Sequence, residues 1–490
     1  MQNLKDNLSD TLIRPRRQNS LQHFLFLSIC ALLALKTFLF IVQVSKTLIY
    51  PFEWSTMDGY FVFYGLRLLS GSPIYFSYQS LLMPLEYVPV FPLVIGALAK
   101  VFGPAVWYER AFSLLCACGM AAIIVRAVSK NSTNRLAPAF AGLLFFAPAS
   151  LSIWFVVRGI DITAAFLALA GVAAVSRPQV SPRRIALAIA LFAAAFYTKQ
   201  TAIFPAAAAI IYFAAQRQWR HCAFLSAGFI ALSAGTFFLL QHLSGGWFLE
   251  NAFLMTANNP FLPGLLVDLF SKFALTLFIV FPIALYQAGR GIRSAGSIWS
   301  FYFFCTLAAA FLAGKAGAAL SYFIPLFSAV CISAGQWLGH QDPLKRKPRA
   351  AAVILVLLLL QSLLFFREKI PAPDGEDFRQ AAILDSWIIA RPGNILIERI
   401  DSFAVNNGRE LNVEAVQLPI LVMHRKYDPD LVIRPLREKA FSLVVYSGVY
   451  FGGIPAVKKA VFENYRVVDE VQIGLFFGKM NFLILAPSES

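Results

Sequence analysis

The 490-residue sequence contains few charged residues. They make up 14% of the chain, and hydrophobic residues make up 58%. An ordinary soluble domain is about 25% charged and about 45–50% apolar, so this composition excludes that class. Many apolar runs reach the roughly 17–25 residues that a helix needs to cross a bilayer. The sequence therefore predicts an all-α polytopic membrane protein.

Histidine and cysteine are also scarce. The five histidines show no metal-ligand spacing, and no G-x-S-x-G or S-x-x-K nucleophile motif is present. All six cysteines lie in apolar runs, which indicates neither a disulfide framework nor a metal cluster. The chain also lacks a G-x-G-x-x-G motif, a P-loop and a repeat of fixed period. A histidine-based mechanism is therefore disfavoured.

Acidic residues are rare in the first three quarters of the chain. Residues 1–366 hold 27 Lys and Arg against 10 Asp and Glu, whereas residues 367–490 hold 15 against 16. The basic excess, which gives a net charge of +16, lies in short loops between apolar runs. Such loops carry topology signals and form no face that could follow a phosphate backbone. Nucleic acid is therefore not an expected partner.

Eleven apolar segments are predicted to span the membrane. With residues 1–20 as a cytoplasmic tail, every strongly basic loop falls on the cytoplasmic side, as the positive-inside rule requires. The first segment is too long for a signal peptide and is interpreted as a retained anchor in a multi-pass plasma (inner) membrane protein. The predicted spans are 22–45, 105–126, 137–156, 161–176, 184–198, 202–216, 221–242, 269–288, 296–313, 318–338 and 350–366.

Two regions are predicted to lie outside the cell membrane. The first is a long outer loop, residues 46–104. Its apolar stretch 88–103 is short, and we interpret it as re-entrant or interfacial, because a full span there would put the later basic loops outside. The second is a small extracytoplasmic α/β domain, residues 367–490, following the transmembrane domain of residues 21–366. Its expected strands are 395–397, 443–446 and 482–486, and its expected helices are 376–390 and 455–465.

Most acids of the first 366 residues fall near the outer side of this topology, which points to chemistry on that face. Asp58 opens a helix-like stretch, 59–70, just after the first span. An ionised carboxylate beside a bilayer is costly to desolvate and usually has a partner or a function. It is a candidate general base or, equally, the N-cap of that helix. The two roles are compatible, because a helix N-terminus keeps an acid ionised.

Arg158 and Asp161 lie three residues apart in the second outer loop and can pair on one helical turn. The structural alternative is an interfacial arginine and a helix cap. The functional alternative is a second acid that positions an acceptor or a metal ion, with the arginine on a phosphate.

The other candidates are polar residues at predicted outer ends. Glu86 and Tyr87 precede two prolines, Pro89 and Pro92, which are expected to stop a regular helix and present both side chains to an interfacial cavity. Tyr87 is otherwise a membrane-belt residue. Lys199 and Lys315 either snorkel to the interface or hold a lipid phosphate.

These motifs, in this order, resemble the integral-membrane glycosyltransferases of the GT-C fold. More narrowly, the chain resembles bacterial relatives of the protein O-mannosyltransferases and of the lipid A aminoarabinose transferase. The likeness spans most of residues 20–370. It is carried by Met57-Asp58-Gly59, the 86–92 run, Phe102-Gly103 ahead of Glu109-Arg110, the Arg158/Asp161 pair, the 197–201 run and an outer C-terminal domain.

The resemblance implies transfer of a hexosyl- or pentosyl-type monosaccharide from a polyprenyl-phosphate carrier, with inversion. The acceptor would be an envelope glycan, lipid or protein. Asp58 would be the general base and Asp161 the acid of the second loop, with the donor phosphate on Arg158, Lys199 or Lys315. Some relatives have Lys-Pro-Pro where this chain has residues 88–90, so that lysine is missing. Some relatives bind a divalent metal ion, which here would fall to Asp58 and Asp161.

The chemistry agrees with this interpretation, since a phosphodiester leaving group carries its charge away and needs no strong general acid. Two other functions stay open. A transporter or lipid flippase predicts pseudo-symmetric halves with broken helices, which the sequence lacks. A glycan polymerase or ligase favours a late outer loop rich in Arg or His, whereas residues 243–268 contain neither Lys nor Arg.

Overall fold

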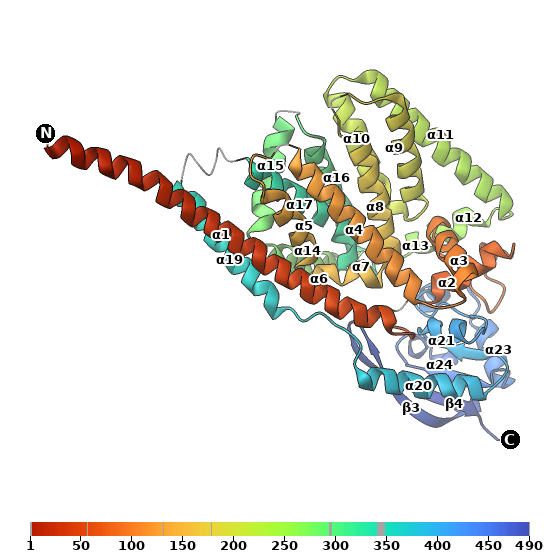
Figure 1. Cartoon of the computed structure of the whole chain (residues 1–490). Helices are drawn as coiled ribbons and strands as arrows, with labels where there is room; N and C mark the ends of the chain where they lie inside the picture. Colours follow the sequence, from red (N-terminus) through yellow and green to blue (C-terminus); the bar gives the residue numbers. More distant parts are fainter. Residues whose placement is uncertain are drawn as a thin grey trace.

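The structure is a computed structural model that describes residues 2–55, 57–130, 132–177, 179–293, 296–340 and 348–489, with side chains from residue 21 onward except at position 348. A helical body carries a smaller unit with a β-sheet at one end, and the two chain termini lie at opposite ends of the molecule (Figure 1). Five described helices are long and apolar enough to cross a membrane, or up to seven if each of two bent pairs is one span. The chain is thus a multi-pass membrane protein.

The long helices pack as the apolar runs predict. α1 and α19 run side by side along the body (Figure 1). Only 11% of the apolar stretch of α11 is buried inside the structure. This helix therefore exposes a large hydrophobic face, as a lipid-facing helix does. The long spans are α1 (Gln2–Ile49), α4 (Trp107–Ser129), α11 (Trp219–Leu243), α17 (Ile324–Gly339, preceded by η4, Leu320–Phe323) and α19 (Pro348–Leu364, followed by η5, Phe365–Arg367).

Two predicted spans are bent. α5 (Ala137–Phe146) meets α6 (Ala149–Ser152) and α7 (Trp154–Val157) at 65°. α14 (Pro263–Thr276) meets α15 (Val280–Arg293) at 94°, so the prediction of one continuous helix over 269–288 is wrong. The reason lies in α19. The Gln361 side chain accepts from the amides of Ile279 and Val280 at 3.1 and 3.2 Å, and it donates to the Thr276 carbonyl at 2.9 Å. It thereby satisfies backbone groups that a break exposes in an apolar environment.

Shorter apolar helices complete the body, and the count of eleven spans stays a prediction. These helices are α8 (Gly159–Ala174), α9 (Pro182–Phe196), α10 (Ile203–Ala215) and α16 (Ile298–Ala310). α8 packs on α4 and α16 packs on α17, whereas α9 and α10 pack on α8, and all four contribute to one continuous apolar core.

The first outer loop contains two helices that cross closely. α2 (Tyr60–Leu69) confirms the predicted 59–70 helix within one residue. α3 (Val90–Phe102) has 13 residues, fewer than a full span, and it contains Pro92 in its first turn. The prolines therefore start this helix and do not stop it, because a first turn needs no amide donor. A Cβ on Gly65 would lie 2.6 Å from the Gly96 nitrogen, so glycine at both positions allows this crossing.

The C-terminal region, residues 367–489, holds a four-stranded sheet of order β1-β2-β4-β3. β1 pairs parallel with β2, whereas β2–β4 and β4–β3 are antiparallel. The three predicted strands and both predicted helices are present. β3 and helices α21, α22 and α23 were not predicted. The elements are α20 (Gly375–Ala390), β1 (Ile395–Ile397), α21 (Asp401–Asn406), α22 (Gln417–Met423), α23 (Asp430–Arg437), β2 (Leu443–Tyr446), α24 (Pro455–Asn464), β3 (Tyr465–Leu475) and β4 (Gly478–Pro487).

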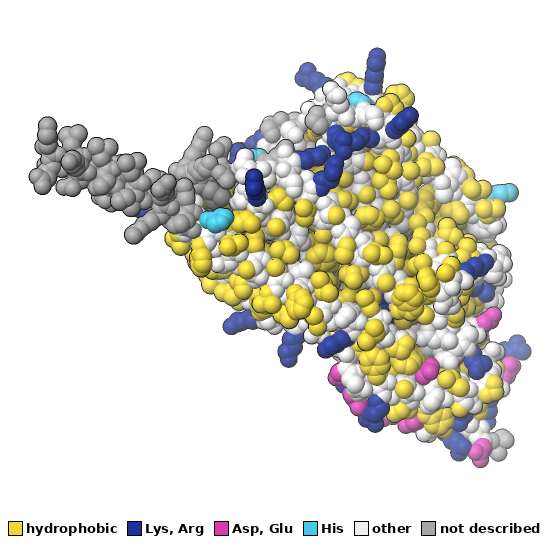
Figure 2. Space-filling model, viewed as in Figure 1, with side chains coloured by type: hydrophobic (Ala, Val, Ile, Leu, Met, Phe, Trp, Pro, Cys, Tyr) yellow, Lys and Arg dark blue, Asp and Glu magenta, His cyan; other side chains and the backbone are white. Residues whose placement is uncertain are grey.

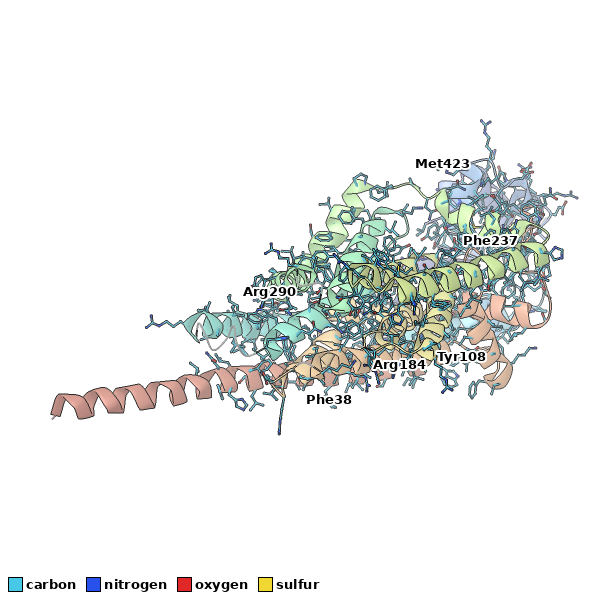
Figure 3. All side chains as sticks on the ribbon, turned by 90° about the horizontal axis from the view of Figure 1, so that it is seen from above. Phe38, Tyr108, Arg184, Phe237, Arg290 and Met423 are labelled. Carbon is cyan, nitrogen blue, oxygen red and sulfur yellow. The ribbon has the colours of Figure 1, made fainter. Side chains whose placement is uncertain are left out.

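The C-terminal region packs directly on the first outer loop. One apolar cluster contains side chains of both, including Tyr50, Trp54 and Phe403. The Trp54 carbonyl accepts from the Phe476 amide at 3.0 Å. Acidic side chains gather at this end of the molecule, beyond an apolar belt, and many Lys and Arg lie at the other end (Figure 2). Seen from above, Met423 of α22 and Arg290 of α15 lie at opposite ends (Figure 3).

Candidate active site

A cavity of about 290 Å³ lies where the helical body, the first outer loop and the C-terminal region meet. Its wall includes the loop ahead of α3, the turn between α7 and α8, and η1 (Gln200–Ala202) after α9. It also includes the segment after η2 (Glu250–Leu254), the turn after η3 (Phe311–Gly314) and the segment ahead of α22. No single element makes this site. Any ligand in it is held by both the membrane part and the C-terminal region.

Five of the seven predicted site residues line this cavity, namely Glu86, Tyr87, Arg158, Lys199 and Lys315. They come from four segments that are far apart in the sequence. Their convergence gives one wall three cationic side chains and a carboxyl group. The structure thus brings these five residues together, and their roles stay predictions.

Lys199 lies at the end of α9, where the helix stops and η1 begins. Its ammonium group pairs with the Asp161 carboxylate and lies 3.8 Å from the centroid of the Tyr322 ring. Asp161 does not line the main cavity. It lies in a smaller adjoining cavity of about 30 Å³, which shares Lys199 and Tyr322 with the first. The predicted second acid thus contacts the site through Lys199, and the charge pair orients that lysine.

Lys315 is presented by a short strand-like contact with the segment ahead of α14. The Leu262 amide donates to the Gly314 carbonyl at 2.7 Å, and the Ala316 amide donates to the Pro260 carbonyl at 2.9 Å. Within the described residues, no carboxylate pairs with the Lys315 ammonium group. A half-buried lysine in a cavity wall without such a partner suits an anionic ligand.

Asp58 is buried, 3% exposed, and is not among the residues that line the cavity. Its Oδ2 accepts from the amides of Trp54 and Ser55, both at 2.9 Å, and from the Arg110 guanidinium at 2.5 Å. The N-cap residue of α2 is Gly59, and no side chain caps that helix. The N-cap interpretation of Asp58 is therefore wrong, because the carboxylate turns back toward its own loop.

Gly59 explains how the chain leaves Asp58. It has φ of +86°, a conformation that glycine adopts at little cost. A Cβ at this position would also lie 2.6 Å from the Ser402 Cα. The Ser402 amide in turn donates to the Glu53 carboxylate at 2.8 Å. The first loop and the C-terminal region thus meet backbone to backbone just beside Asp58.

Arg110, on the first turn of α4, is the partner that sequence analysis did not assign to Asp58. Its guanidinium donates to the carbonyls of Thr47, Tyr50 and Phe52 at 2.6–2.7 Å as well as to Asp58. It therefore caps the end of α1 and fixes the start of the first outer loop. The Asp58–Arg110 pair holds the loop that carries Glu86.

Glu414, in the C-terminal region, was not predicted and lines the cavity together with Glu86. Burial and the Glu414 charge raise the pKa of Glu86 above its ordinary value, and the nearby Arg158 acts against this rise. Burial also raises the pKa of Glu414, opposed by hydrogen bonds from the backbone amides of Gln417 and Val416 and by the charge of Arg158. The Glu414 charge thus opposes the ionisation of Glu86.

The residues present do not fit a resident divalent metal ion. Among the described positions, no three or more His, Cys, Asp and Glu side chains lie close enough to hold one. Asp58 and Asp161, the predicted ligands, are each paired with a cation, Arg110 and Lys199. A carboxylate already paired with a base is a poor ligand for a metal ion, because the metal must displace its partner.

Comparisons with known proteins give a clear result for the fold. No protein-family model matches the chain, and no curated protein sequence matches it. Solved structures do match. ArnT from Cupriavidus metallidurans bound to undecaprenyl phosphate has a TM-score of 0.60 at 14% identity, over 92% of this chain and 97% of that one. The Archaeoglobus fulgidus oligosaccharyltransferase in its apo form has a TM-score of 0.54 at 10% identity, over 89% and 72%. The mycobacterial arabinofuranosyltransferase AftD has a TM-score of 0.50 at 15% identity, over 94% and 40%.

This chain has the GT-C fold. The similar structures are all glycosyltransferases of that fold, and the likeness covers both the helical body and most of the remaining chain. The resemblance inferred from the motifs is thereby confirmed at the level of the fold. The likeness does not fix the residues of the site, which rest on the geometry described above.

Proposed function

We propose that this protein transfers a monosaccharide from a polyprenyl-phosphate carrier to a glycan, lipid or protein of the cell envelope. Transfer occurs on the outer face of a plasma (inner) membrane, with the N-terminus cytoplasmic and the C-terminal region outside. One observation carries the proposal: three cationic side chains and two carboxyls share a cavity between membrane helices and the C-terminal region. This is the combination that a phosphate leaving group and an attacking hydroxyl require.

The donor phosphate is assigned to Lys315, Lys199 and Arg158. Cations that meet the phosphate oxygens stabilise the charge that develops as the bond to the sugar breaks. The small cavity that adjoins Lys199 lies between α8, α10 and α16, and five of its thirteen lining residues are alanines. The fold supports this assignment, because the similar structures include ArnT bound to undecaprenyl phosphate and the archaeal AglB with a dolichol-phosphate.

Transfer occurs by direct displacement. A carboxylate removes the proton of the acceptor hydroxyl, the hydroxyl oxygen attacks the anomeric carbon, and the carrier leaves as polyprenyl phosphate. The leaving group needs no protonation, which agrees with a cavity wall that holds cations and no histidine among its lining residues. Transfer with inversion of the anomeric centre follows from a single displacement.

The test uses membranes that contain the full-length protein and a set of radiolabelled polyprenyl-phosphate monosaccharides. The expected result is label in an envelope acceptor and free polyprenyl phosphate as the second product. Lys315→Gln is expected to reduce transfer at limiting donor. Lys272→Gln, an exposed lysine on α14, is the matched control and leaves transfer unchanged. Movement of the intact donor across liposomes without covalent transfer supports a flippase and refutes the proposal.

A further inference from the structure

Two glutamates from different parts of the chain face the cavity. Glu86 belongs to the first outer loop and precedes α3. Glu414 belongs to the C-terminal region and precedes α22, more than three hundred positions later in the chain. Both line the same wall, so the pair exists only while the C-terminal region is seated on the first loop. Asp58, by contrast, lies outside the cavity and is held by Arg110.

Glu86 has a buried carboxyl oxygen without a protein partner. The residue is 5% exposed, and its Oε2 accepts no hydrogen bond from the described residues. Glu414 differs, because its Oε2 accepts from the Gln417 amide at 2.5 Å. Buried carboxyl oxygens in native proteins are almost always hydrogen-bonded. Glu86 also lines the cavity, so a ligand there can offer a hydrogen-bond donor to its carboxyl group.

The charges around Glu86 come from several elements. Glu414 and Gln417 face it from the C-terminal region, Arg158 from the turn between α7 and α8, and Tyr87 from its own loop. Tyr60 of α2 lies beside it, since the Glu86 amide donates to the Tyr60 hydroxyl. Lys199 and Lys315 complete the charged groups of the cavity wall.

Burial and, after it, the Glu414 charge raise the pKa of Glu86, whereas side-chain hydrogen bonds from Gln417 and Tyr87 and the charge of Arg158 lower it. A general base works best when its pKa lies near the working pH, because it is then both ionised and basic. A solvated carboxylate of pKa near 4.3 is a weaker base. Burial and the Glu414 charge together thus raise the basicity of Glu86 for proton abstraction from a hydroxyl.

We propose that Glu86 is the general base and that Glu414 of the C-terminal region is a positioning residue that acts on Glu86 through its charge. This inference rests on the proposed function. The Glu86 carboxylate takes the proton of the acceptor hydroxyl. The oxygen lone pair of that hydroxyl forms the bond to the anomeric carbon. The bond from that carbon to the phosphate oxygen breaks, and its electron pair leaves on the polyprenyl phosphate.

The arrangement also assigns a role to the C-terminal region. By placing Glu414 against Glu86, it completes the base only when it is docked. An undocked C-terminal region leaves Glu86 in a more solvated wall, with a lower pKa and less basicity. Transfer is therefore coupled to docking, and the site is complete only in the assembled chain.

The first arm of the test is the pH dependence of transfer by the full-length protein in membranes. Activity falls as pH drops through the pKa of Glu86, because the base must be ionised. Glu86→Gln is expected to lower kcat at least about 100-fold, the scale of a lost general base. Glu414→Gln removes a neighbouring negative charge, so the acidic limb of its profile moves to lower pH, and kcat falls more than the donor KM changes.

Glu250→Gln is the matched control. Glu250 pairs with Lys426 of the C-terminal region at 2.6 Å and does not line the cavity. This variant removes a charge at the same junction, so a purely structural effect of losing a carboxylate there would also appear in it. We expect its acidic limb to stay at the wild-type pH.

The second arm measures the carboxyl directly and needs no activity. Infrared difference spectra of wild type and Glu86→Gln, recorded over a pH series, identify the Glu86 carboxyl band and its midpoint. Glu414→Gln is expected to lower that midpoint. If the midpoint of the Glu86 band is unchanged in Glu414→Gln, or if Glu86→Gln transfers sugar at the wild-type rate with an equal melting temperature, the assignment of the base is wrong. The proposed glycosyltransferase function is not refuted by either result. A wild-type protein that transfers no sugar from any donor refutes the proposed function and the base with it.

Discussion

Replacing Asp58 by Asn is expected to destabilise the fold, so a loss of activity in this variant is not by itself evidence for catalysis by Asp58. The carboxylate and Arg110 are 4% and 1% exposed and form a pair that also holds the end of α1. Asparagine keeps the shape and can still accept from the amides of Trp54 and Ser55, but it leaves the guanidinium charge without a counter-ion. Removal of one partner from a buried pair costs about 3–5 kcal/mol. This is a large share of the roughly 5–15 kcal/mol that stabilises a typical fold.

The matched control is Asp268→Asn. Asp268 pairs with Lys272 on α14 at 2.8 Å, with both side chains at least half exposed. Exposed pairs contribute about 0–1 kcal/mol, because water and salt screen them. The assay is thermal unfolding of purified protein in detergent, followed by tryptophan fluorescence. Asp58→Asn is expected to melt well below wild type, and Asp268→Asn is expected to melt close to it.

A double-mutant cycle makes the reasoning refutable. Arg110→Gln alone loses the Asp58 pair and the bonds to Thr47, Tyr50 and Phe52. The double variant should therefore be more stable than the sum of the two single losses predicts. Additivity within about 0.5 kcal/mol would show that the two residues do not interact and would contradict the account. Loss of transfer in Asp58→Asn identifies a base only if its melting temperature equals that of wild type.

Three further predictions concern other parts of the site. Lys315→Gln should weaken binding of polyprenyl phosphate roughly tenfold, which is the effect of one lost charge-assisted hydrogen bond. The melting temperature should not change, because Lys315 is half-buried and carries no ion pair among the described residues. Unchanged binding in a lipid-capture assay would remove Lys315 from the donor site. Gly59→Ala should abolish docking of the C-terminal region, because the new Cβ would lie 2.6 Å from the Ser402 backbone. The control Gly264→Ala in α14 should be tolerated, because nothing lies within 4 Å of the new Cβ. Limited proteolysis of both variants tests this prediction. Glu398→Gln should destabilise the turn 447–451 by at least about 2 kcal/mol, because the Glu398 carboxylate accepts from four backbone amides of that turn at 2.6–2.9 Å. Hydrogen exchange of the turn amides should become faster in this variant. It should stay at the wild-type rate in the control Glu463→Gln, whose side chain is exposed.

The long apolar helices and three of the four strands could be predicted because each is a local property of the chain. The length of an apolar run decides whether it can cross a bilayer. Strands such as Ile395–Ile397 are short buried runs that the same inspection finds. β3 was not predicted, because its residues alternate irregularly between buried and exposed and include Asp469 and Glu470. The break between α14 and α15 depends on Gln361, more than eighty residues away.

The candidate site was predictable in part for the same reason. Glu86, Lys199 and Lys315 were found by their places in the predicted topology, and these places are local. Glu414 carried no signal, since an acid between two elements of an outer region is ordinary in sequence. The partner of Asp58 was also invisible, because the Arg110 guanidinium reaches it from another helix. Long-range contacts determine that Glu86 lines the cavity and that Asp58 is buried in a pair with Arg110.

The measurement that tests the central claim most directly is transfer of labelled sugar from polyprenyl-phosphate donors to envelope acceptors by membranes with wild type or Glu86→Gln. Expression and melting temperature are matched between the two. The account predicts labelled product and released polyprenyl phosphate with wild type, and neither with Glu86→Gln. Equal transfer by both proteins would contradict the assignment of the base. Donor movement across the membrane without any covalent product would contradict the glycosyltransferase itself.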